Sequence, residues 1–328
     1  MKKEEVESCF LAALGRRPLP LETDLFLQKD VNWLEERLSH IAKPKCAILL
    51  SGNVRKGSIL KSLSYLKDVD VFAFVWDNIG VKGTEMNLSL SDPDAVSEVV
   101  SRIPHLKAHK MASNKNFIES IRQETESRKY FNFSSDEIFI KSQMYAIKKS
   151  HELMEDYCRK TGTSYDMVVK MRFDCSINRF LPDDKTMGFV NTGNAVFVTN
   201  DDAHPHPHFS NGCMVCNKMY DIDLHIPHIF NHSNIICDIM AYGGREPMKR
   251  WCSMYDHYDE WNDYFAEENK NFLTKRNIPL TITGKNIKVN RIDHMFYLYC
   301  SYPERIFQYH MRDYMLISSR GILVRFHR

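Results

Sequence analysis

The chain has 328 residues, of which 43% are hydrophobic and 26% are charged, as in a globular protein with a sizeable core. Its 44 basic and 42 acidic residues leave a formal net charge of +2, which excludes the global basic field of a typical nucleic-acid-binding protein. No apolar run approaches the roughly 18 residues of a membrane-spanning helix, and the N-terminal sequence MKKEEVESCF predicts no secretory signal.

Nine cysteines are scattered along the chain, most of them in apolar surroundings. An odd count without regular spacing favours reduced thiols over a disulfide framework. We therefore expect a cytoplasmic protein with no nucleic-acid partner and, at most, peripheral association with the inner face of a membrane.

Residues 4–42 have the pattern of a small helical unit. EVESCFLAAL has helical apolar spacing and stops at Gly15, which is placed to cap the helix. VNWLEERLSHIA carries Val31, Leu34, Leu38 and Ile41 on one face. We expect residues 1–43 to form an N-terminal appendage and residues 44–328 to form one α/β domain, with a donor half at about 44–180 and an acceptor half at about 181–328.

A βαβ unit is predicted next. The continuous apolar run from Ala47 to Leu50 is typical of a buried parallel strand. The run breaks at Ser51-Gly52-Asn53, passes into the helix SILKSLSYLK, and is followed by a second apolar run that ends at Asp77. Strand, helix and strand within about thirty residues indicate an α/β sheet.

Further elements extend this pattern. Asp92 or Asp94 could cap a helix in DPDAVSEVVSRI, and IPHLKAHKM could hold a short strand. A long helix is predicted for residues 136–159, followed by the strand YDMVVKMRFDCSI with its charged tip. GFVNTG and AVFVTN have the pattern of short strands. The predicted fold class is α/β, with a mixed or parallel sheet flanked by helices.

The residues just past the predicted strands are the candidate ligand site, because open α/β sheets bind ligands beyond the carboxyl ends of their strands. They are Ser51, Gly52, Asn53 and Arg55, then Asp77, then Arg172 and Asp174. Backbone N–H groups at a helix start with Arg55 nearby suit an anionic ligand such as a nucleotide. Each residue also has a purely structural interpretation: a tight turn at Gly52, a loop cap at Asp77, and an ion pair between Arg172 and Asp174.

Four segments in this order carry a family resemblance. The succession CAILLSGNVR, DVDVFAFVWDN, KSQMYAIKKSHELM and YDMVVKMRFDCSI resembles glycosyltransferases of bacterial and viral surface-polysaccharide clusters, including WavE-type lipopolysaccharide enzymes. The N-terminal FLAALGRRPLPLETDLFLQ is similar to a short helical module attached to such transferases. The likeness covers roughly residues 45–180 and the N-terminal module.

The resemblance implies a GT-A-like fold, a nucleotide-sugar donor and a glycan acceptor. By position, Ser51, Gly52, Asn53 and Arg55 would contact the nucleotide, and Asp77 its base or ribose. Two residues of the long helix, Gln143 and Lys148, are further candidates for the donor phosphates, although a solvated surface lysine would look the same.

Metal dependence is left open by the sequence. Arg172 and Asp174 stand where GT-A enzymes carry a DXD motif, whose carboxylates hold a divalent ion against the donor diphosphate. Asp174 could hold Mg²⁺ or Mn²⁺ with the phosphate oxygens. Arg172 replaces the first carboxylate, however, and its guanidinium could neutralise the leaving phosphate directly.

The stretch HPHPHFSNGCMVC has three interpretations, of which the first is an ordinary solvated loop. In the resembling family a loop at this distance leads to the acceptor site, so Asp201, Asp202, His206 and His208 are candidates for the catalytic base or for acceptor contacts. The third is a zinc site with His208, Cys213 and Cys216. No second Cys-x-x-Cys pair follows, which disfavours zinc.

The sequence thus predicts a nucleotide-sugar-dependent glycosyltransferase acting on a surface glycan. Three alternatives stay open: a non-catalytic nucleotide- or glycan-binding protein of the same fold, a zinc-stabilised interaction module, and a phosphotransferase acting on surface polymers.

Overall fold

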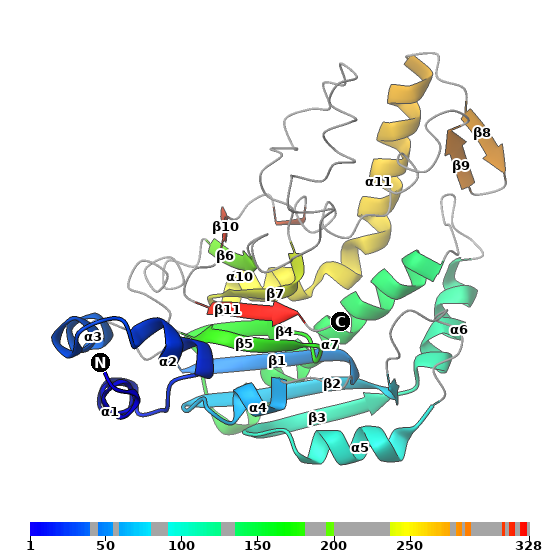
Figure 1. Ribbon diagram of the computed structural model, residues 1–328. Coiled ribbons are helices and arrows are strands. Elements are labelled where there is room, and N and C mark those ends of the chain that lie inside the picture. The colour runs from blue at the N-terminus through cyan, green and yellow to red at the C-terminus, as the bar shows by residue number, and fades with distance from the viewer. Residues whose placement is uncertain are drawn as a thin grey trace.

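The computed structural model describes residues 1–39, 45–54, 59–79, 91–125, 135–180, 195–199, 237–275, 280–283, 286–289, 310–311, 315–318 and 322–326. Figure 1 shows the arrangement of its elements. The helices are α1 (Lys3–Leu14), α2 (Pro20–Phe26), α3 (Val31–Ser39), α4 (Ile59–Leu63), α5 (Pro93–Ser101), α6 (Asn114–Thr125), α7 (Ser135–Thr161), α10 (Arg245–Cys252) and α11 (Met254–Lys275). The strands are β1 (Cys46–Val54), β2 (Val69–Ile79), β3 (Leu106–Ala112), β4 (Met167–Met171), β5 (Cys175–Phe180), β6 (Ala195–Thr199), β7 (Cys237–Gly243), β8 (Leu280–Thr283), β9 (Asn286–Val289), β10 (Met315–Ser318) and β11 (Ile322–Phe326).

The main sheet has seven strands in the order β10-β6-β7-β4-β1-β2-β3. Strands β4, β1, β2 and β3 run parallel to one another, whereas β7 runs antiparallel to both β4 and β6. Two-stranded antiparallel ladders, β5 with β11 and β8 with β9, lie outside this sheet. This mixed sheet flanked by helices confirms the expected α/β fold class and is consistent with the expected GT-A-like arrangement.

Strand β1 forms the centre of the core because both of its faces are apolar. Ile48 and Leu50 belong to a cluster that includes side chains of α4, α5 and β5, whereas Ala47 and Leu49 belong to a cluster with α7, α10 and α11. A strand that is buried on both faces needs a continuous apolar run, and AILL supplies it. The sheet is therefore a middle layer between helices.

Most elements predicted from the sequence are confirmed. Gly15 ends α1 in the left-handed conformation with φ 64°, and its N–H donates to the Leu11 carbonyl. Of the two candidate caps of α5, Asp92 accepts a hydrogen bond from the Ala95 N–H. The long helix, the strand after it and the strand in AVFVTN are all present. The strand predicted in GFVNTG lies outside the described residues.

A buried ion pair fixes residues 1–39, the helical unit, to the α/β core. Arg16 donates to both carboxylate oxygens of Glu22, at 2.9 and 3.0 Å, and the side chains are 5% and 0% exposed. Arg16 also donates to the Phe180 carbonyl at 2.7 Å, and the Phe180 N–H donates to Glu22 at 2.9 Å. The pair thus clamps the end of β5.

Strand β5 connects two edges of the molecule. It begins at Cys175, directly after the turn that follows β4, and ends at Phe180 against α2. In Figure 1 the helical unit lies beyond the edge at which β1 and β2 begin. The boundary predicted at residues 43 and 44 falls in a segment outside the described residues and stays a prediction.

Two expectations about the chain as a whole concern cysteines and membrane spans. Cys9, Cys46, Cys158, Cys175 and Cys252 are buried free thiols. Among the described helices, none combines the length and apolarity needed to cross a bilayer.

Candidate functional site

The ends of three neighbouring strands meet at one edge of the sheet. In the register of β1 with β4, Leu50 lies beside Met171, so Ser51 and Arg172 follow at adjacent positions. In the register of β1 with β2, Gly52 lies beside Val75, two residues before Asp77. Neighbouring strands are about 4.8 Å apart. The structure therefore brings together the strand ends that the sequence singled out.

The end of β1 carries buried polar atoms and a glycine in open space. The register with β2 shifts between Gly52 and Val54: only Asn53 lies between these two positions on β1, whereas three residues lie between their partners Val75 and Ile79, so the extra residues of this irregularity are on β2. The Ser51 Oγ and the Asn53 Oδ1 are buried without a hydrogen-bond partner among the described residues. Gly52 has φ +102°, and a Cβ there would meet no atom within 4 Å. Buried atoms of this kind require an explanation, and a polar ligand over Gly52 supplies one.

The turn after β4 holds a two-pronged ion pair. Arg172 donates from Nε to Asp174 Oδ1 at 2.9 Å and from Nη2 to Oδ2 at 2.8 Å. The side chains are 17% and 4% exposed. Burial raises the pKa of Cys175 to about 12, and this neutral thiol donates to the Arg172 carbonyl at 2.9 Å. The pair and the thiol fix the turn, so the guanidinium lies at a defined place beside the end of β1.

Asp77 has structural partners. Its carboxylate accepts hydrogen bonds from the Asn114 N–H at 3.1 Å and from the Ser91 hydroxyl at 3.1 Å. The first of these bonds is at the start of α6. These bonds agree with the interpretation of Asp77 as a loop cap. A contact with a nucleotide base or ribose stays a prediction, and it would use the remaining lone pairs of the Asp77 carboxylate.

The candidates on α7 pack towards α11. The Lys148 ammonium pairs with Asp256, and the buried Lys141 pairs with Asp259 at 2.9 Å. A role for Lys148 at donor phosphates would require its ion pair to open. That role and the role of Gln143 stay predictions.

Several predicted site residues lie outside the described residues. They are Arg55 on the first strand-end loop, the acceptor-loop candidates Asp201, Asp202, His206 and His208, and the zinc candidates Cys213 and Cys216.

The sequence analysis missed a fully buried lysine one residue before the end of β4. Lys170 is 0% exposed. Burial raises the pKa of Cys175 and Cys252, and the positive charge of Lys170 opposes both rises, so the ammonium lies near both thiols. The sequence did contain a sign of this residue, namely a lysine within the apolar strand MVVKM. Charged side chains are rare in a strand that is buried on both faces, because burying an ammonium group is costly.

The described residues do not form a ligand set for Mg²⁺ or Mn²⁺. Within the described part of the chain, no three His, Cys, Asp or Glu side chains gather into a group that could hold a metal ion. Asp174 offers one carboxylate, and both of its oxygens already accept from Arg172. A hard divalent ion needs about six oxygen ligands. The cation that accompanies Asp174 is the Arg172 guanidinium.

Comparisons with known proteins give a distant structural likeness. No family model and no curated protein matches the chain. Among solved structures, the chain is similar to mouse xyloside xylosyltransferase 1 in its apo form. The likeness has 9% identity and a TM-score of 0.33 over 68% of this chain and 74% of that one. At this TM-score the likeness does not define a function, and the strand ends themselves supply the functional observations.

Proposed function

We propose that this chain is a glycosyltransferase that moves a sugar from a nucleotide-sugar donor to a surface glycan. The supporting observation is the edge where Ser51, Gly52 and Asn53 meet Arg172 and Asp174, which we name the strand-end site. The sequence resemblance to surface-polysaccharide transferases, including the lipopolysaccharide type, supports the same class.

The strand-end site suits the nucleotide diphosphate part of such a donor. Gly52 leaves space for a phosphate or ribose to approach the backbone. Ser51 and Asn53 offer a hydroxyl and an amide that would gain hydrogen bonds on binding. Arg172 would contact the diphosphate, and Asp174 would hold the guanidinium in place. Arg55 and Asp77 would complete the nucleotide contacts.

In the proposed reaction an acceptor hydroxyl attacks the anomeric carbon of the donor sugar. The bond from that carbon to the diphosphate oxygen breaks, and the nucleotide leaves with the electron pair. Arg172 would neutralise the negative charge that develops on the leaving phosphate. The hydroxyl proton would pass to a base, for which Asp201, Asp202, His206 and His208 are the candidates.

A non-catalytic nucleotide-binding protein is the second candidate. It is favoured by Arg172 at the place of the first DXD carboxylate and by the engagement of both Asp174 oxygens. Such a protein would bind nucleotides and release no sugar.

The first experiment measures the melting temperature with UDP, GDP, CDP and CMP, each with Mn²⁺ or with EDTA. A ligand that binds only the folded chain raises the melting temperature by mass action. We expect one nucleotide to raise it and EDTA to leave most of the rise, because a guanidinium stands beside Asp174. No rise with any nucleotide would contradict the donor site. A rise lost in EDTA would assign Asp174 to a metal.

The second experiment follows nucleotide release from UDP-glucose, GDP-mannose and CMP-sialic acid. Asp174→Asn should lower the release at least about 100-fold, the usual effect of losing one stabiliser of transition-state charge. The matched control is Asp94→Asn, since Asp94 is exposed in the first turn of α5. Full activity of Asp174→Asn would overturn the donor-site assignment. Nucleotide binding without release from any donor would favour the second candidate.

A further inference from the structure

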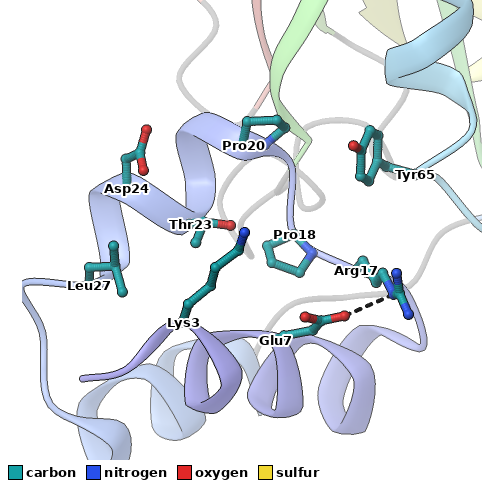
Figure 2. A pocket seen from close by; sticks show the side chains of 9 residues that line it. All are labelled: Lys3, Glu7, Arg17, Pro18, Pro20, Thr23, Asp24, Leu27 and Tyr65. Carbon is teal, nitrogen blue, oxygen red and sulfur yellow. Dashed lines mark ion pairs between the residues drawn. The ribbon is translucent and has the colours of Figure 1, made fainter.

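A cavity lies where the helical unit meets the α/β core, and we name it the seam cavity. It has a volume of about 310 Å³ and is lined by α1, α2, the segment that joins them, and Tyr65 of the core. Figure 2 shows the Tyr65 ring across the cavity from the side chains of the helical unit.

Both walls of the seam cavity are held in place. The helical unit is clamped to β5 by Arg16 and Glu22, which bond to the Phe180 backbone. Tyr65 packs against the apolar cluster that surrounds β1. The cavity is thus formed before any ligand arrives, which is usual for binding sites and lowers the entropy lost on binding.

The charged groups of the seam cavity cancel. Lys3 and Arg17 bring two positive charges, and Glu7 and Asp24 bring two negative charges. Arg17 pairs with Glu7 at 2.8 Å, whereas Lys3 and Asp24 have no ion-pair or hydrogen-bond partner among the described residues. A lining without net charge does not select an anion or a cation. It offers donors and acceptors side by side, which suits a ligand that carries many hydroxyl groups.

The remaining lining is uncharged and mostly apolar. The Tyr65 ring and the rings of Pro18 and Pro20 face the cavity together with the Thr23 side chain. A sugar ring has an apolar C–H face and a rim of hydroxyls, so a lining that joins an aromatic ring with charged groups matches both of its surfaces. A volume of about 310 Å³ is at the small end of ligand pockets, which run from about 300 Å³ upward. It suits a short stretch of glycan.

We propose that the seam cavity binds a short segment of a neutral oligosaccharide. Its assignment to the acceptor of the reaction rests on the proposed function. In Figure 1 the helical unit lies at the edge opposite the ends of β1 and β2. The nine residues of β1 span about 30 Å between these edges. The seam cavity would therefore hold a distant part of the glycan chain and raise its effective concentration at the strand-end site.

The experiment titrates the whole chain with maltotriose, cellotriose and chitotriose and follows binding by saturation-transfer NMR. At least one neutral trisaccharide should bind with a Kd in the millimolar range or below. Tyr65→Ala should weaken that binding at least tenfold, whereas Tyr65→Phe should stay within threefold because the ring is retained. Trp33→Ala removes an exposed ring of α3 that does not line the cavity, and it should change nothing.

Three results would overturn the proposal. They are the absence of binding by all three trisaccharides, undiminished binding in Tyr65→Ala, and tighter binding of trigalacturonate than of the neutral sugars. A urea midpoint for each variant separates loss of binding from loss of folding, and Tyr65→Phe provides the test if Tyr65→Ala fails to fold.

Failure of this inference is distinguishable from failure of the proposed function. Asp174→Asn should keep trisaccharide binding, and Tyr65→Phe should keep the nucleotide-induced rise in melting temperature. Trisaccharide binding without any nucleotide effect would remove the glycosyltransferase proposal and keep a glycan-binding seam. A nucleotide effect without trisaccharide binding would remove the proposal for the seam cavity and keep the glycosyltransferase proposal.

Discussion

Two arginine–carboxylate pairs lie at opposite ends of β5. In each pair the guanidinium donates two hydrogen bonds to one carboxylate. The pair of Arg16 and Glu22 is enclosed, and its oxygens also accept from the Leu19 and Phe180 N–H groups. The pair of Arg172 and Asp174 instead stands beside buried polar atoms that have no described partner.

The difference between the pairs lies in their surroundings. A buried pair whose lone pairs are all used joins two parts of a fold, and losing either member leaves a charge without compensation. A pair beside unsatisfied atoms and an open glycine retains capacity for a ligand. The chain thus uses one interaction as a clamp at one edge of the sheet and, in our proposal, as a binding element at the other.

The largest effect is expected at the clamp. Glu22→Gln keeps the shape of the side chain but leaves the Arg16 charge buried without its counter-charge. We expect a loss of about 3–5 kcal/mol of unfolding free energy, measured by urea denaturation. The matched control is Glu98→Gln, since Glu98 pairs with Arg102 on an exposed helix surface. That change should cost at most about 1 kcal/mol.

A second variant sharpens this test. The double variant Arg16→Met, Glu22→Leu removes both charges, so the buried-charge penalty disappears. It still leaves the N–H groups of Leu19 and Phe180 without their acceptor. We therefore expect it to remain less stable than the natural chain. Equal loss in Glu22→Gln and Glu98→Gln would show that the clamp contributes no more than a surface pair.

A smaller effect is expected at the strand-end site. Ser51→Ala removes a buried hydroxyl that has no described partner, so the unliganded chain should keep its stability or gain up to about 1 kcal/mol. The nucleotide-induced rise in melting temperature should shrink in the same variant. Ser62→Ala is the control, because the Ser62 hydroxyl accepts from the Ile177 N–H at 3.1 Å.

In the control the result should be reversed. Ser62→Ala should lose about 1–2 kcal/mol of stability and keep the nucleotide effect. If Ser51→Ala is strongly destabilised and keeps the full nucleotide effect, Ser51 stabilises the fold and does not contact the nucleotide.

The smallest effect concerns a third pair, Arg245 with Glu155, which is half-exposed and lies beside the buried His151. Burial lowers the pKa of His151; Arg245 and Lys249 lower it further, and Glu155 and Glu152 oppose them. The unfolded chain then binds a proton that the folded chain does not. Stability should therefore fall as the pH drops below about 6.5, the value of a free imidazole, and should be flat above it.

The measurement compares urea denaturation of the natural chain and His151→Gln from pH 7.5 to pH 5.5. The natural chain should lose up to about 1 kcal/mol more than the variant over this range, because one proton is worth at most about 1.4 kcal/mol per pH unit. Parallel pH profiles would show that His151 titrates in the folded chain as it does in the unfolded one. The other histidines affect both proteins equally.

Local patterns predicted much of the fold and the position of the candidate site. The apolar run at Ala47–Leu50 predicted β1, but the break predicted at Ser51-Gly52-Asn53 was wrong, because the strand continues to Val54. Two ends were predicted by their own residues, Gly15 for α1 and Asp92 for α5. These features depend on neighbours within a few residues, so the amino-acid order suffices for them.

Contacts between distant residues could not be predicted in the same way. Arg16 and Phe180 are 164 positions apart, and no local pattern in LGRRPLPLETD marks Arg16 and Glu22 as a buried pair. The irregularity between Val75 and Ile79 of β2 exists because β1 pairs with β2 in one particular register. Lys170 became a buried ammonium only once α10 had packed over the sheet.

The sequence by itself determined which segments become strands and helices, and hence which polar residues stand at strand ends, because periodicity and capping act over a few residues. The tertiary structure decided which strand ends are neighbours, which ion pair is enclosed, and where a cavity is left between Tyr65 and the helical unit. These outcomes depend on packing and desolvation, which arise only when segments far apart in the chain come into contact.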